Sequence, residues 1–428
     1  MSSEEIEVLV VGAGQAGLAM SAQLTERGIP HLVLERARIA EKWRSERWDS
    51  LVANGPAWHD RFPGLEIAGV DPAGFATKEQ VADYFVEYAA MTSAPIRTGV
   101  EVLSVERNVG RLGFTVTTSD GTIEARSVVA ATGAFQKPVI PAVLPDAVGM
   151  EQIHSSSYHR PAQLSEGAVL VVGAGSSGVQ IADEIQKSGR QVYLSVGPHD
   201  RPPRSYRGQD FVWWLGVLGK WEASTPPQGA EHVTIAVSGA NGGRTVDFRA
   251  LAASGIHLVG RTLGLEAGLL RFGSDLAANI AGGDANYLAL LQEADAWIER
   301  NGLDFPEEPE AHVLGPDPSC VTEPTLALDL EAAGIRTVVW ATGYTGDYGW
   351  LPASALDDGG RPKHQRGVSA ESGLYFLGLP WQSRRGSSFI WGVWHDATYL
   401  ADQIAIQRGY LVELGIAPGI PLTTGVTS

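Results

Sequence analysis

One sequence pattern occurs twice in this chain and limits its fold more than any other feature. A run of apolar, mostly β-branched residues leads into Gly-x-Gly-x-x-Gly and then directly into a helical sequence, first over residues 8–24 and again over residues 169–185. In such a unit the apolar run is a strand buried on both faces, and the glycines form the turn at which the helix begins. The repeat predicts an α/β fold with two units of this kind.

Each glycine of the first turn has a physical role. Gly12 permits the tight turn, Gly14 removes a side chain where a pyrophosphate must approach the backbone, and Gly17 lets the helix pack closely. The helix N-terminus then faces the phosphates. The next strand, residues 31–34, is followed by Glu35, which is placed to accept hydrogen bonds from a ribose hydroxyl. These parts together predict a dinucleotide site, although such turns also occur for packing alone.

The second turn lacks the ribose acid. Its cofactor-binding candidates are Gly173, Gly175, Ser176, Ser177 and Gly178. Val196 stands at the position that matches Glu35, and Arg201, Arg204 and Arg207 follow closely. An acid would repel a 2′-phosphate, whereas arginine binds it through charge-assisted bonds. The second site is therefore predicted to take NADP(H), with Arg201 and Arg204 as ligands; a solvated charged loop is the alternative.

Two strand ends share the sequence Ala-Thr-Gly. A predicted strand over residues 127–131 runs into Thr132 and Gly133, and a second over residues 336–340 runs into Thr342 and Gly343. Small residues at a strand end allow a backbone to approach a bound nucleotide, so these four residues are candidate cofactor contacts. One such strand end is expected in each unit.

Charge and cysteine content exclude several classes of function. The net charge of −17 argues against nucleic acid or an anionic membrane as a partner, since both would repel the chain. No apolar run is long enough to span a bilayer, and the acidic start does not resemble a signal peptide. Cys320 is the single cysteine, which excludes a dithiol redox pair and makes a cytoplasmic location the expectation.

Two further motifs complete a family resemblance. Ser50-Leu51-x-x-Asn54-x-Pro56 looks like the Ser-Leu-x-Thr-Asn-x-Pro segment of class B flavin-dependent monooxygenases, which include the flavin-containing monooxygenases. Residues 148–158 are similar to that family's Phe-x-Gly-x-x-x-His-x-x-x-Tyr fingerprint through His154 and Tyr158, while Val148 and Met150 depart from it. With both glycine turns, the likeness covers nearly the whole chain and is nearest to short bacterial members.

The resemblance implies an FAD domain split around an inserted NADP domain. The expected segments are residues 1–160 and 336–428 for the two parts of the FAD domain and 161–335 for the NADP domain. The expected cofactors are FAD and NADPH, with no metal. Further cofactor contacts are expected from Gln15, Ala16, Arg36, Trp43 and Gln382; for Gln382 an exposed loop position is the alternative.

The resemblance also implies a reaction. NADPH would reduce FAD, O2 would add to form a C4a-(hydro)peroxyflavin, and a nucleophilic nitrogen or sulfur of a small organic substrate would take the distal oxygen. Asn54 is the candidate catalytic residue, as a polar group beside the peroxide. Tyr158 stands where Baeyer–Villiger members carry Trp, which favours heteroatom oxidation.

The sequence leaves alternative functions open. On the same fold, the chain could be a Baeyer–Villiger oxygenase or an NADPH oxidase. A nucleotide-binding or redox-sensing protein without turnover is the alternative from another class. The partners expected are a small-molecule substrate and O2, with no nucleic acid and no membrane. The sequence does not decide between a monomer and a homodimer.

Overall fold

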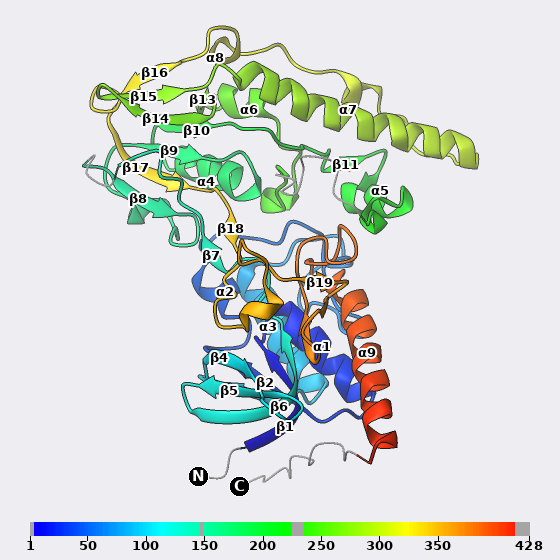
Figure 1. Ribbon diagram of the computed structural model, residues 1–428. Helices are drawn as coiled ribbons and strands as arrows, with labels where there is room; N and C mark the ends of the chain where they lie inside the picture. The colour runs from blue at the N-terminus through cyan, green and yellow to red at the C-terminus, as the bar shows by residue number, and fades with distance from the viewer. Residues whose placement is uncertain (1–3, 146–148, 225–234, 416–428) are drawn as a thin grey trace.

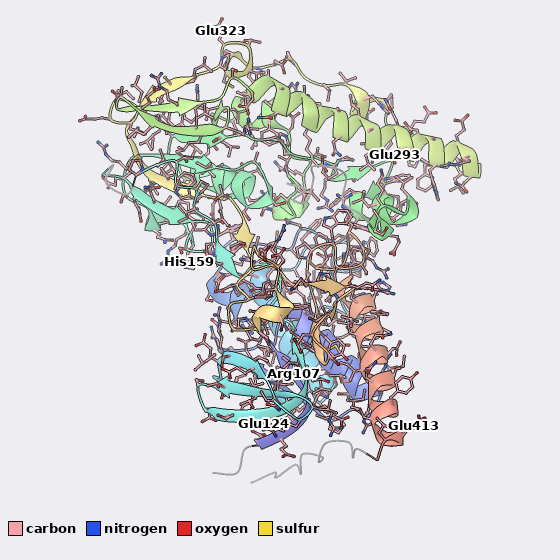
Figure 2. The ribbon with its side chains drawn as sticks, in the orientation of Figure 1. Arg107, Glu124, His159, Glu293, Glu323 and Glu413 are labelled. Carbon is pink, nitrogen blue, oxygen red and sulfur yellow. The ribbon has the colours of Figure 1, made fainter. Side chains whose placement is uncertain are left out.

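The computed structural model describes residues 4–145, 149–224 and 235–415, which form two lobes joined at a narrow waist (Figure 1). Two short strands lie at the waist, β7 (Lys137–Pro138) and β18 (Tyr344–Thr345), and they pair antiparallel. His159 also lies at this waist (Figure 2), and its carbonyl accepts a hydrogen bond from the backbone N–H of Asp49 at 2.8 Å. The chain therefore crosses between the lobes at a two-stranded connection.

The first lobe is built on a sheet assembled from both ends of the chain. Its parallel core has the order β3-β2-β1-β6-β21, and α1 packs beside the C-terminal α9. The strands of this sheet are β1 (Glu4–Val11), β2 (His31–Glu35), β3 (Ile96–Thr98), β4 (Val102–Arg107), β5 (Phe114–Thr118), β6 (Gly121–Ala130), β19 (His364–Gln365), β20 (Val368–Ser369) and β21 (Leu374–Phe376). An insertion between β6 and β18 forms most of the other lobe.

The second lobe contains a five-stranded, fully parallel sheet of order β13-β10-β9-β17-β8. Its strands are β8 (Glu151–His154), β9 (Ala168–Val172), β10 (Val192–Ser195), β13 (His257–Val259) and β17 (Ile335–Trp340). A small antiparallel sheet of β14 (Thr262–Glu266), β15 (Leu269–Phe272) and β16 (Ala327–Asp329) lies beside it, and β11 (Ser205–Tyr206) pairs with β12 (Gln209–Asp210). The prediction of an α/β fold with two parallel-sheet units is confirmed.

The helices follow the strands in both lobes. They are α1 (Gln15–Glu26), α2 (Glu41–Ser45), α3 (Lys78–Met91), α4 (Ser176–Lys187), α5 (Phe211–Val217), α6 (Phe248–Ala253), α7 (Leu276–Asn301), α8 (Ser319–Thr322) and α9 (Val393–Glu413). Among the described residues, no helix is both long enough and apolar enough to cross a membrane.

Sheet pairing corrects the two predicted segment borders at residues 160 and 335. Both β8, from the predicted first segment, and β17, from the predicted third segment, belong to the second sheet, where Trp340 lies opposite His154 on one side and Val172 on the other. A strand belongs to the sheet whose strands complete its hydrogen bonds, and those partners are distant in sequence. The chain crosses between the lobes at β7 and β18 instead.

Candidate functional site

The first glycine turn has the close packing that its sequence predicts. Gly12 has φ +108°, and a Cβ added there would lie 2.8 Å from the carbonyl oxygen of Ala131. A Cβ on Gly17 would collide with the carbonyl of Gly12, whereas a Cβ on Gly14 would meet nothing within 4 Å. The turn therefore presses helix α1 against β1 and leaves open space at Gly14, before the first residue of the helix.

Glu35 lies beside this turn, as predicted. Its Oε2 accepts a hydrogen bond from the backbone N–H of Ala13 at 2.8 Å, and its Oε1 accepts one from Ala37 at 3.0 Å. Two backbone donors thus fix the carboxylate at the end of β2. Because an ionised carboxylate can accept about four hydrogen bonds, it keeps acceptor capacity for ribose hydroxyls.

The segment after β2 returns to the glycine turn. The backbone N–H of Ala40 donates to the carbonyl of Ala13 at 3.1 Å. Trp43 is half-buried and packs against the hydrophobic cores of both lobes, and Arg36 is exposed. Trp43 has a packing role in this structure; cofactor contacts for Trp43 and Arg36 stay predictions.

Three segments converge beside the first turn. A Cβ on Gly378, just after β21, would lie 2.9 Å from the Cβ of Ala16 in α1 and 4.0 Å from the Cα of Gly133. Gly133 itself has φ +77° and faces open space. The Ala-Thr-Gly end of β6, the end of β21 and the start of α1 therefore enclose one region at the carboxyl edge of the first sheet.

Two side chains at this edge carry buried polar atoms that lack a partner. Within the described part of the chain, neither the Thr132 hydroxyl nor the Gln382 Nε2 has a hydrogen-bond partner. The Gln382 Oε1 accepts a hydrogen bond from the N–H of Leu379 at 3.3 Å, which orients the amide. Gln382 is buried, so the alternative of an exposed loop position is wrong. An unsatisfied buried polar group costs about 1–3 kcal/mol, so these two atoms fit a bound group that hydrogen-bonds them.

Asn54 lies where the two lobes meet. Its Oδ1 accepts a hydrogen bond from Nε2 of Gln180 at 2.9 Å, and its backbone carbonyl accepts one from Arg204 at 2.6 Å. Gln180 belongs to α4 of the second lobe, is buried, and is a residue that the sequence reasoning missed. The sequence did contain a signal for Gln180: it is a polar residue two positions after Gly178, on the face of α4 that is expected to be buried.

The second glycine turn repeats the geometry of the first. Gly173 has φ +119° and packs against the carbonyl of Ala341, and a Cβ on Gly178 would collide with the carbonyl of Gly173. Gly175 is the N-cap of α4. The similarity of the two turns supports the prediction that both are built to hold phosphates.

The start of α4 is also joined to a neighbouring segment. Both the backbone N–H and the hydroxyl of Ser176 donate to the carbonyl of Ile235, each at 2.8 Å. Ser177, the next residue, is half-buried. Ile235 therefore lies directly beside the second turn.

Thr342 and Gly343 are bonded to the connection between the lobes, unlike the Thr132 hydroxyl of the first lobe, which has no partner among the described residues. The Thr342 hydroxyl donates to the carbonyl of Val139, and the N–H of Val139 donates to the carbonyl of Gly343 at 3.0 Å. The His154 ring also contacts the Gly343 carbonyl through Nε2 at 3.0 Å, and burial lowers the pKa of this histidine. This strand end holds the connection between the lobes, which argues against its predicted contact with a nucleotide.

The arginines after β10 are corrected as candidate 2′-phosphate ligands. Arg201 and Arg204 are buried, and both are held by carboxylates: Nε of Arg201 lies 2.8 Å from Asp284, and Nη2 of Arg204 lies 2.5 Å from Asp210. Arg207 pairs with Asp295 at 2.8 Å. Because Arg201 and Arg204 are buried, the alternative of a loop exposed to solvent is also wrong for these two residues. Sequence spacing could not show these partners, because two of the three carboxylates are more than 80 residues away.

Arg261, which the sequence analysis did not single out, lies beside the position that matches Glu35. It follows β13, and its side chain packs against Gly197, directly after the position that matches Glu35. The Ser195 hydroxyl fixes this loop by donating to the carbonyl of Gly260 at 3.0 Å. The side chain of Arg261 is 62% exposed and pairs with Asp275 at 2.6 Å. Its guanidinium is therefore open to solvent at the carboxyl edge of the second sheet.

The correction for Arg204 can be tested by stability. Arg204→Met leaves Asp210 without its buried partner, which should lower the free energy of unfolding by about 3 kcal/mol. We expect no selective loss of NADPH affinity. Urea unfolding measures the stability, and titration with NADPH measures the affinity. Arg300→Met, at an exposed position, is the control, and its free energy of unfolding should stay within about 0.5 kcal/mol of the parent value. Unchanged stability with weakened NADPH binding would instead restore the original assignment.

Comparisons with known proteins agree with this architecture. A family model described as pyridine nucleotide-disulphide oxidoreductase matches residues 9–209. An uncharacterized CzcO-like oxidoreductase of Geobacillus kaustophilus (strain HTA426) is 37% identical over 405 residues, which cover 93% of this chain and 98% of that protein.

Solved structures share the fold at low sequence identity. A flavin-containing monooxygenase from Stenotrophomonas maltophilia superimposes with a TM-score of 0.64 at 18% identity, covering 94% of this chain and 99% of the other. An oxidized steroid monooxygenase bound to NADP gives a TM-score of 0.54 at 19% identity, over 98% and 88% of the two chains. The fold is thus that of two-domain flavin monooxygenases.

Proposed function

Because this chain belongs to the family of CzcO-like oxidoreductases, we propose that it is an FAD-dependent monooxygenase that uses NADPH and O2. Its substrate is a small organic molecule with a nucleophilic nitrogen or sulfur. The observation that carries the proposal is the edge of the first sheet, where Gly14 leaves open space and, among the described residues, the buried Thr132 hydroxyl and the Gln382 Nε2 have no hydrogen-bond partner.

The residues at this edge fit FAD. The N-terminus of α1 and the space at Gly14 suit a pyrophosphate, and Glu35 suits the ribose hydroxyls of the adenosine. Thr132 and Gln382 offer the polar atoms that a buried, heteroatom-rich group needs. When bound, FAD would supply the redox chemistry by taking a hydride from NADPH and activating O2.

The second turn is the proposed NADPH site. The start of α4 would face the pyrophosphate, as α1 does in the first lobe. Arg261 replaces Arg201 and Arg204 as the proposed ligand of the 2′-phosphate, because its exposed guanidinium lies beside the position where other dinucleotide sites carry an acid.

The chain's own residues position the reactants and exclude water. Asn54 is the proposed catalytic residue, since its amide lies between the lobes and Gln180 holds it in place. Gln180 is a positioning residue in this scheme. Its amide also donates to the carbonyl of Val237 at 2.9 Å, which fixes its own orientation.

Rapid mixing of the NADPH-reduced protein with oxygenated buffer tests the proposed reaction. We expect a transient flavin spectrum that differs from the oxidised and the reduced forms and decays faster when an amine or thioether is added. Immediate return of oxidised flavin together with hydrogen peroxide would indicate an oxidase. Acceleration by ketones alone would indicate a Baeyer–Villiger oxygenase, and purified protein without flavin would indicate a binding protein without turnover.

Substitution of Asn54 tests its proposed role. Asn54→Ala should leave FAD content unchanged and reduce the product formed per NADPH consumed by roughly tenfold or more, because a preorganised hydrogen-bonding group is lost. Product and NADPH are measured in the same assay. Asn301→Ala, at the exposed end of α7, is the matched control and should keep the parent ratio. Equal coupling in Asn54→Ala would contradict the role.

Arg261→Gln tests the proposed contact with the 2′-phosphate. Loss of a charge-assisted hydrogen bond should raise the Kd of NADPH by about 10- to 100-fold and leave the Kd of NADH within about twofold. Both values can be measured by fluorescence titration. Arg300→Gln removes the same charge at the far end of α7 and should change neither. An equal loss of affinity for NADPH and NADH would show that Arg261 does not bind the 2′-phosphate.

A further inference from the structure

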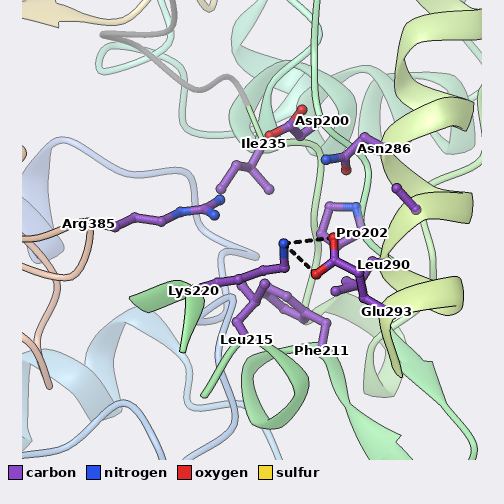
Figure 3. A pocket seen from close by; sticks show the side chains of 11 residues that line it. Asp200, Pro202, Phe211, Leu215, Lys220, Ile235, Asn286, Leu290, Glu293 and Arg385 are labelled. Atoms are coloured by element: carbon purple, nitrogen blue, oxygen red, sulfur yellow. Dashed lines mark hydrogen bonds and ion pairs between the residues drawn. The ribbon is translucent and has the colours of Figure 1, made fainter. Parts of the chain in front are cut away.

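A cavity in the second lobe has an apolar wall and several charged groups. It lies between α5, α7 and the segment after β21, and encloses about 460 Å³ of empty space including its open mouth. Phe211, Leu215 and Leu290 form much of the apolar wall, and Ile235 lies opposite (Figure 3). The cavity thus combines an apolar wall with a few charged groups, as binding sites for small organic ligands do.

The cavity is lined by segments that also contact the two glycine turns. Ile235, on its wall, accepts two hydrogen bonds from Ser176 at the start of α4. On the opposite side, Arg385 belongs to the segment that begins at Gln382 and continues to Ser388, whose carbonyl accepts a hydrogen bond from Gln15 of the first turn at 3.1 Å. A ligand in the cavity would therefore lie next to the segments proposed to hold the two cofactors.

One pair of charges in the cavity is already neutralised. Nζ of Lys220 lies 2.7 Å from one carboxylate oxygen of Glu293 and 3.0 Å from the other, as the dashed lines in Figure 3 show. This pair attracts neither anions nor cations strongly, because each charge is compensated by the other.

Arg385 is not neutralised in this way. Its guanidinium is directed into the cavity (Figure 3), and in the parts of the chain that the structure describes its side chain has no hydrogen bond and no ion pair. It lies 5.6 Å from the centre of the Trp221 ring. Burial lowers the pKa of Arg385, and the Asp200 carboxylate opposes that effect without pairing with it. The neighbouring Arg384, in contrast, is bound to Glu222.

We propose that this cavity is the substrate site and that Arg385 selects organic acids, whose carboxylate it binds while their apolar body packs on the opposite wall. A half-buried guanidinium such as that of Arg385 suits a carboxylate, because the planar pair forms two charge-assisted hydrogen bonds. The Phe211 and Leu290 side chains supply the apolar surface. The proposal rests on the monooxygenase function proposed above and gives that function a class of substrate.

Calorimetric titration of the FAD-loaded protein, without NADPH, tests the proposal. The probes are 4-(methylthio)benzoate, its neutral amide and thioanisole, which share an aromatic thioether. We expect the acid to bind about tenfold or more tightly than either neutral compound. Arg385→Gln should remove this preference and leave the affinity for the neutral compounds within about twofold. Arg385→Lys should retain part of it, since Lys keeps the charge but loses the bidentate geometry.

Arg384→Gln is the matched control, because Arg384 is adjacent in sequence and held by Glu222. It should bind the acid as the parent does. Equal binding of acid and neutral probes by the parent, no binding of the acid at millimolar concentration, or an unchanged preference in Arg385→Gln would each overturn the proposal. Tighter binding of benzylamine than of the acid would assign the cavity to cations through Asp200 instead. Because these titrations consume neither NADPH nor O2, their outcome is independent of the rapid-mixing experiment.

Discussion

The structure depends on one packing constraint, which is met twice. In each lobe the last turn glycine, Gly17 or Gly178, lies so close to the carbonyl of the first turn glycine that no β-carbon fits. This contact presses the helix onto its strand and directs the helix N-terminus to the carboxyl edge of the sheet. The positive φ of Gly12 and Gly173 lets the chain turn there. Both candidate pyrophosphate sites follow from this arrangement.

The two units share this turn but use their strand ends differently. In the first lobe the buried Thr132 hydroxyl has no partner in the part of the chain that the structure describes, whereas in the second the equivalent Thr342 hydroxyl is bonded to the connection between the lobes. His154 adds a second contact to the same connection through the Gly343 carbonyl. The same short sequence therefore joins the two lobes in one unit and is a proposed ligand contact in the other.

The junction between the lobes brings together residues that the sequence separates widely. Asn54 meets Gln180, 126 positions later, and the Ser50 hydroxyl donates to Glu184 across the same junction at 2.7 Å. The cavity beside Arg385 forms in the same way, from segments of both lobes. Local sequence patterns cannot predict such contacts, because the partners of a side chain depend on how separate helices and strands pack.

The sequence by itself determined the α/β class, the two glycine turns and the position of Glu35, since each follows from local spacing and periodicity. The assembly of the first sheet from both chain ends was expected only from the family resemblance. It could not determine the lobe to which β8 and β17 belong, because sheet membership is set by distant hydrogen-bond partners. Tertiary structure alone decided that the carboxylate-paired Arg201 and Arg204 are buried, whereas Arg261, which pairs with Asp275, is exposed. The physical reason is that an arginine's role depends on which carboxylates the fold brings within reach.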